Sequence, residues 1–102
     1  MINRTFALAA VCLLTSLSAQ AGTLEKIAER GEINLAYRSD TPPFSSHNAE
    51  RQPEGFTVDL CKIIAEDIRT HLGMDRLKIN WIQVSADDRI DAVASGRADM
   101  EC

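Results

Sequence analysis

The chain has 102 residues, with 15 acidic and 11 basic side chains and a formal net charge of -4 at pH 7. Nucleic acids and anionic membrane surfaces attract basic proteins, so this charge balance argues against both as partners. A chain of this length can form one small hydrophobic core, which is marginally stable without further support. The composition therefore predicts one small acidic unit.

The N-terminal segment has the three parts of a secretory signal peptide. Arg4 supplies the positive charge, residues 6–14 form an apolar run, and residues 19–21 read Ala-Gln-Ala, a small-x-small ending. The apolar run is shorter than the roughly 20 residues that cross a bilayer, which argues against a membrane anchor. Cys12 lies inside that run, which argues against a lipid anchor. We predict that residues 1–21 are removed on export and that the mature chain is periplasmic.

Helices and strands are expected to alternate along the remaining chain. Apolar residues spaced by three and four predict helices, and strict alternation predicts strands. The expected elements are a helix at 24–30, a strand at 33–37, a loop at 41–53, a helix at 59–72, a strand at 77–84, a helix between 85 and 96, and a strand from about 98. This order predicts an α/β fold, an open and mostly parallel sheet with helical crossovers.

Both longer helices have expected ends. Asp59 suits the N-cap of the helix at 59–72, and Gly73 offers its stop. Ser85 followed by Asp88 resembles a capping box in which Asp replaces the usual Glu. These caps predict where the two helices begin.

Two cysteines remain after the predicted cleavage, Cys61 and Cys102. In an oxidising compartment thiols tend to pair, so a disulfide is one interpretation, and two ordinary buried cysteines are the other. A metal site is not expected, because His47 and His71 show no ligand spacing to either cysteine. No cofactor is expected either.

Two arginines are expected at one edge of the sheet. Ligands of open α/β sheets bind beyond the carboxyl ends of the strands. Arg38 directly follows the first strand, and Arg89 lies in the first turns of the helix that Ser85 opens. Because arginine can grip a carboxylate with two parallel hydrogen bonds, the pair suggests a ligand with two carboxylates. Alternatively, each arginine pairs with a local acid such as Asp40 or Asp87 on a solvated surface.

Five stretches of the chain, in this order and spacing, resemble a known family. They are Thr-Leu-Glu-Lys-Ile at 23–27, Arg-Ser-Asp-Thr-Pro-Pro-Phe at 38–44, Gly-Phe-Thr-Val-Asp-Leu-Cys at 55–61, Arg-Ile at 89–90 and Asp-Met-Glu-Cys at 99–102. The chain is similar to the family 3 periplasmic solute-binding proteins, the polar amino-acid receptors of ABC importers, and most closely to their glutamate/aspartate branch. The resemblance implies a periplasmic binding protein type II fold, in which two lobes close on an amino acid. Residues 22–102 would then be the N-terminal, incomplete part of the first lobe.

The resemblance also assigns roles to individual residues. It implies that Arg89 holds the ligand α-carboxylate and that Arg38 suits a side-chain carboxylate, hence glutamate or aspartate. Thr41 stands where other branches carry a ring that stacks on the ligand. Acidic-ligand members often have Ser three residues before the helix arginine; this chain has Ala86 there, so either Ser85 replaces that serine or one ligand contact is lost.

The resemblance implies binding and not catalysis. The full-length protein would be a monomeric substrate-binding component that captures an acidic amino acid and presents it to an inner-membrane ABC permease. Phe44 and Phe56 are expected to pack the lobe. Two alternatives stay open: a periplasmic enzyme on the same fold, similar to cyclohexadienyl dehydratase, since Arg38 with Arg89 also suits prephenate, and a ligand-sensing receptor domain, which shares the Gly-Phe-x-Val-Asp-Leu stretch.

Overall fold

The computed structural model describes residues 22–102, so the predicted signal peptide lies outside the described part of the chain. The elements, in order, are α1 (Thr23–Arg30), β1 (Glu32–Tyr37), β2 (Asp40–Thr41), β3 (Ser45–His47), β4 (Pro53–Glu54), α2 (Phe56–His71), β5 (Lys78–Gln83), α3 (Arg89–Ala94) and β6 (Met100–Glu101). The expected helices and strands are present, and three further short strands lie between β1 and α2. Within residues 22–102 no helix combines the length and the apolarity that a membrane crossing requires.

The main sheet has three strands in the order β5-β1-β6. Both neighbours of β1 run parallel to it; Leu35, for example, lies opposite Trp81 on β5 and Met100 on β6. The predicted α/β fold with a parallel sheet is therefore confirmed. Because all three strands run in the same direction, their carboxyl ends meet at one edge.

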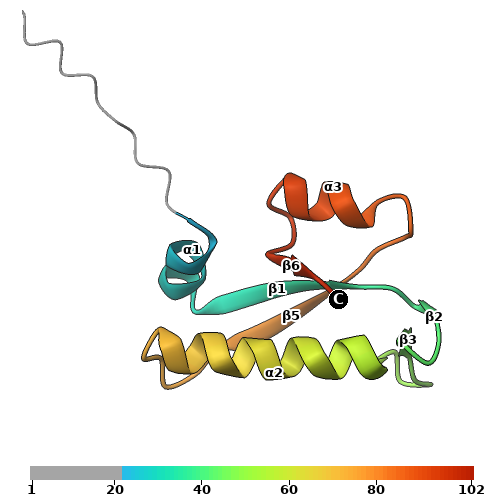
Figure 1. The fold of residues 1–102 in the computed structure, drawn as a ribbon, viewed down its shortest axis with the longest axis horizontal. Helices are drawn as coiled ribbons and strands as arrows, with labels where there is room; N and C mark the ends of the chain where they lie inside the picture. The colour runs from blue at the N-terminus through green and yellow to red at the C-terminus, as the bar shows by residue number, and fades with distance from the viewer. Residues whose placement is uncertain (1–21) are drawn as a thin grey trace, which may run out of the picture.

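The helices cover both faces of this sheet, with α2 on one side and α3 on the other (Figure 1). Side chains alternate along β1, so Ile33 and Leu35 point to the face that α2 covers, whereas Ala36 points to the face that α3 covers. On the first face the buried cluster is Ile27 of α1, Ile33, Leu35, Cys61 and Ala65. On the second face it is Ala36, Val84, Ala92 and Ala98. One strand thus contributes to two separate cores.

The expected loop at 41–53 contains regular structure. Strands β2, β3 and β4 form a small antiparallel sheet, in which Thr41 pairs with Ser45 and His47 with Pro53. Strands of two or three residues are too short for an alternating pattern to be recognised, and two of the prolines lie in the turn between β2 and β3. The prediction of an irregular loop was wrong for these residues.

Helix α2 begins at Phe56, three residues before the predicted start, so Asp59 lies inside the first turn and is not the N-cap. The cap is Gly55, whose φ is +127° and at which a Cβ atom would lie 2.9 Å from the Pro43 carbonyl oxygen. The first helical amide groups are satisfied by the preceding loop: Phe56 N–H donates to the Pro43 carbonyl and Thr57 N–H to the Phe44 carbonyl. A capping side chain is therefore not needed, so the position of Asp59 did not mark the start of the helix.

Candidate functional site

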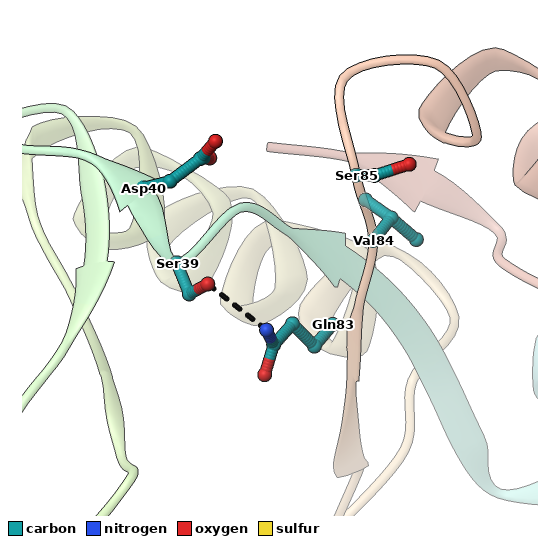
Figure 2. Close-up of a pocket in the computed structure, with 5 residues that line it drawn as sticks. All are labelled: Ser39, Asp40, Gln83, Val84 and Ser85. Atoms are coloured by element: carbon teal, nitrogen blue, oxygen red, sulfur yellow. Dashed lines mark hydrogen bonds between the residues drawn. The ribbon is translucent and has the colours of Figure 1, made fainter.

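The segment that follows β1, together with the end of β5 and the residues after it, lines an open pocket of about 280 Å³ at the carboxyl edge of the sheet. Its lining residues are Ser39, Asp40, Gln83, Val84 and Ser85. Figure 2 shows that Ser39 and Asp40 come from one segment and the other three residues from the second. The Gln83 side-chain amide joins the two segments by donating to the Ser39 hydroxyl, with an N–O distance of 2.9 Å. The expected crevice beyond the strand ends is therefore a pocket with mainly polar side chains.

The backbone of Arg38 is fixed beside this pocket by Ser45. The Ser45 side chain is buried, donates to the Arg38 carbonyl oxygen at 2.6 Å and accepts from the Arg38 N–H at 3.0 Å. A single hydroxyl thus satisfies both polar backbone groups of the residue that leaves the main sheet. The sequence did not reveal this role, because Ser45 lay in a segment that was expected to be irregular.

The side chain of Arg38 is paired with Asp40. Its Nε donates to one carboxylate oxygen at 3.0 Å and its Nη2 to the other at 3.3 Å. These hydrogen bonds lower the pKa of Asp40 and raise the pKa of Arg38. The local pairing that the sequence left open is therefore present for Arg38.

Arg89 is the first residue of α3, and its N–H donates to the Ser85 carbonyl at 3.1 Å. Its Nη1 lies 3.7 Å from a carboxylate oxygen of Glu101 on β6, so its acidic partner is Glu101 and not Asp87. Its Nε is buried and has no hydrogen-bond partner among residues 22–102. Arg89 is thus less fully engaged than Arg38.

Glu101 is a further charged residue of the site. Glu101 pairs with Arg89, and its charge also contributes to the raised pKa of Arg38, although the hydrogen bond that Arg38 donates to Asp40 is the larger cause. Both arginines therefore lie within the electrostatic reach of one carboxylate. Its position at the end of the last strand was the signal that could have identified it.

The two predicted hydroxyl residues both support the backbone. Ser85 accepts from the Asp88 N–H at 3.1 Å, the hydrogen bond that a capping box predicts, but α3 begins one turn later and its N-cap is Asp88. Thr41 donates to the Ser45 carbonyl at 3.0 Å across the β2-β3 pair. Of these two residues, Ser85 also lines the pocket.

Phe44 and Phe56 lie where the β2-β3 turn contacts the start of α2. The two residues are 56% and 63% exposed within residues 22–102, so they are not core residues of this part of the lobe, and their packing in the complete lobe stays a prediction. The cause is the pairing between the two segments, in which the Phe56 and Thr57 amide groups bind the carbonyls of Pro43 and Phe44. This backbone contact leaves both rings on the outside.

Cys61 of α2 and Cys102 form a disulfide, with Cα atoms 6.0 Å apart. This is one of the two states that the sequence left open. Thr57, also on α2, donates to the Phe44 carbonyl at 2.8 Å, and its hydroxyl lies 3.4 Å from the Cys102 carbonyl. The end of β6, and with it Glu101, is thereby attached to α2.

The described residues contain no group of three or more side chains that could hold a metal ion. The site is instead an arrangement of arginines, carboxylates and hydroxyl groups at the end of a parallel sheet. Such a set of groups can bind a polar anion through charge-assisted hydrogen bonds.

Residues 33–102 match the model of the bacterial extracellular solute-binding proteins, family 3. This match covers more than half of the chain and agrees with the parallel sheet and the polar pocket at its carboxyl edge. The chain therefore belongs to this family.

Two characterised relatives come from Pseudomonas aeruginosa. The L-glutamate/L-aspartate-binding protein is 37% identical over 82 residues, which are 79% of this chain and 27% of the relative. Cyclohexadienyl dehydratase is 36% identical over 95 residues, which are 88% of this chain and 35% of the relative. This chain thus spans about a quarter to a third of the length of these relatives.

The fold also matches solved structures. The crystal structure of the ancestral amino acid-binding protein AncCDT-1, a precursor of cyclohexadienyl dehydratase, has a TM-score of 0.64 and 28% sequence identity. The match covers 76% of this chain and 32% of that one. Both comparisons place amino-acid binding and dehydratase activity among the functions of similar proteins.

Proposed function

We propose that the full-length protein is the periplasmic substrate-binding component of an amino-acid ABC importer and that its ligand is glutamate or aspartate. The observation that carries the proposal is the presence of two arginines, Arg38 and Arg89, beside the carboxyl edge of the parallel sheet. Residues 22–102 supply part of the first lobe. The ligand is bound between two lobes, and the closed monomer delivers it to an inner-membrane permease.

Arg89 binds the α-carboxylate of the ligand. Its exposed Nη groups are held only by a 3.7 Å contact with Glu101, and its Nε has no partner among the described residues. A ligand carboxylate could accept charge-assisted hydrogen bonds from the exposed part of this guanidinium. The loose pairing therefore makes Arg89 the general anchor for amino acids.

Arg38 recognises the side-chain carboxylate and so favours acidic ligands. Ser85 lines the pocket, and because its hydroxyl oxygen accepts from the Asp88 N–H, its own proton is available to a ligand oxygen. Thr41 is short and directs its hydroxyl to the Ser45 carbonyl, so it leaves room for a polar ligand side chain. These four residues form the first-lobe half of the proposed site.

Calorimetric titration of the full-length protein with L-glutamate, L-aspartate and L-glutamine tests the proposal. We expect tight binding of both acidic amino acids. Arg89→Ala should raise the dissociation constant of every ligand by about a hundredfold or more, because it leaves the bound α-carboxylate of the ligand without its partner. Arg38→Ala should remove the preference for acidic side chains. Arg69→Ala is the matched control, since Arg69 is paired with Glu66 on α2, and should leave binding unchanged.

A periplasmic dehydratase is the second candidate function. It is favoured by the 36% identity to cyclohexadienyl dehydratase and by the suitability of two arginines for a dicarboxylate such as prephenate. Adding prephenate to the same titration separates the two proposals. Turnover of prephenate would contradict a transport receptor, whereas unreacted binding of glutamate and aspartate would contradict the enzyme.

A further inference from the structure

Asp40 occupies only one side of the Arg38 guanidinium. It accepts from Nε at 3.0 Å and from Nη2 at 3.3 Å, whereas Nη1 takes part in none of the hydrogen bonds between residues 22–102. Guanidinium groups have five N–H donors, so a second carboxylate could still approach Arg38 from the other side. The pairing therefore weakens the positive charge of Arg38 without blocking the group.

The position of Asp40 is set by the backbone and not by the ion pair alone. Asp40 lies on β2 opposite Ser46 of β3, and the neighbouring Thr41 is held by its hydrogen bond to the Ser45 carbonyl. The Asp40 side chain is 64% exposed and lines the pocket. A ligand in the pocket would therefore meet the negative charge of Asp40, and Arg38 would be reached through its hydrogen bonds to that carboxylate.

We propose that Asp40 sets the selectivity of the site by offsetting the charge of Arg38, so that the preference for an acidic ligand over its uncharged amide is moderated. The inference rests on the proposed function and extends it to a residue that is not itself expected to hold the ligand. Arg38 and Asp40 together carry no net charge. The affinity for an amide ligand is therefore closer to the affinity for an acidic ligand than it would be beside an unpaired arginine. Removing the charge of Asp40 should sharpen the discrimination.

The chain offers a closely matched control for this charge. Glu66 accepts from Arg69 at 2.6 to 3.1 Å, and the exposed fractions of its side chain and of its partner, 63% and 31%, resemble the 64% and 24% of Asp40 and Arg38. The Glu66–Arg69 pair lies within α2 and does not line the pocket. Glu66→Gln therefore removes the same kind of charge at a different place.

The test is the ratio of the L-glutamine to the L-glutamate dissociation constant, measured by calorimetry on the full-length protein. Asp40→Asn should raise this ratio by about three- to tenfold, a modest change because solvent screens the exposed carboxylate. Asp40→Ser, which removes the charge without supplying an amide, should shift the ratio in the same direction. Asp40→Glu, which keeps the charge, and Glu66→Gln should leave it within about twofold.

A ratio that falls or stays constant in both Asp40→Asn and Asp40→Ser, while the wild type binds glutamate, would overturn the role of Asp40 and leave the proposed function intact. An equal shift in Glu66→Gln would also overturn it, because the effect would then be one of overall charge. A wild-type protein that binds no amino acid would overturn the proposed function and this inference with it.

Discussion

The two faces of the parallel sheet are built from side chains of different size. Under α2, the core combines large aliphatic residues of β1 with the Cys61–Cys102 disulfide. Under α3, three of the four buried core residues are alanines. The α2 face therefore supplies most of the buried apolar area, whereas the α3 face lets a helix lie close to the strands and places Arg89 near their carboxyl ends. Stability and the candidate site depend on opposite sides of one sheet.

Among the substitutions that test this difference between the two faces, Leu35→Ala should have the largest effect on the free energy of unfolding. Leu35 is fully buried on the α2 face, and removing its side chain would leave a cavity in the larger core. We expect a loss of about 3 to 4 kcal/mol in the free energy of unfolding, measured by urea denaturation of the full-length protein. Ile90→Ala, on an exposed side chain of α3, is the control and should cost much less. Similar losses for the two variants would contradict the assignment of the α2 face as the main core.

Loss of the disulfide should have the next largest effect. The bond joins residues 41 positions apart, and in the chain-entropy model a loop of this length corresponds to about 4 kcal/mol, from which any strain is subtracted. Replacing both cysteines with serine should lower the free energy of unfolding by about 2 to 4 kcal/mol. Reductant should destabilise the wild type and not the double variant. Equal sensitivity of both proteins to reductant would show that the cysteines are not paired in solution.

Ala92→Leu should disturb the α3 face. Ala92 is fully buried against the strands, so a larger side chain has to push α3 away at a cost of about 1 to 3 kcal/mol. Because Arg89 is on the same helix, we expect glutamate binding to weaken as well. Ala94→Leu places the same side chain at an exposed position of α3 and should change neither quantity. If Leu35→Ala weakened glutamate binding and Ala92→Leu did not, the assignment of the candidate site to the α3 face would be contradicted.

Acidification should have the smallest effect. Arg38 hydrogen bonds lower the pKa of Asp40 in the folded protein. This group therefore stabilises the fold at pH values above its unfolded pKa, about 4, and the contribution is lost as the pH falls through the lower folded value. The difference in unfolding free energy between the wild type and Asp40→Asn should be greater at pH 7 than in strong acid, because Asp40 loses its charge as the pH falls through its lowered pKa. A difference that does not change with pH would contradict the Arg38–Asp40 pairing in solution.

The sequence predicted the parts of the fold that follow from periodicity. The alternation at 33–37 and the amphipathic spacing at 59–72 identified β1 and α2, and the order of the elements identified a parallel sheet. Position relative to strand ends was sufficient to select Arg38 and Arg89. The predictions of the elements and of the sheet succeeded because they depend on a repeating local pattern and on the order of the elements, whereas the ligand-binding roles of Arg38 and Arg89 stay predictions.

The remaining features depend on contacts between distant segments. The start of α2 is set by carbonyl groups of the loop at 43–44, and the Arg38 backbone is held by a hydroxyl seven residues later. The acidic partner of Arg89 is Glu101 on β6, which lies outside the helix that carries Arg89. Strand-end position could have pointed to Glu101, but the local sequence carries no pattern for the other two contacts, which only the folded arrangement reveals.

The strand order β5-β1-β6 also affects how the sheet can assemble. Glu32 pairs with Lys78, and Leu35 with Met100, so every ladder contact of β1 joins residues more than 40 positions apart. As the chain is synthesised from its N-terminus, β1 has no sheet partner until residues 78–83 have been made. Long-range parallel pairing of this kind slows folding, because the entropy of closing long loops is lost before the contacts form. The central strand β1 is thus synthesised early, but it can pair within the sheet only after β5, and later β6, has been made.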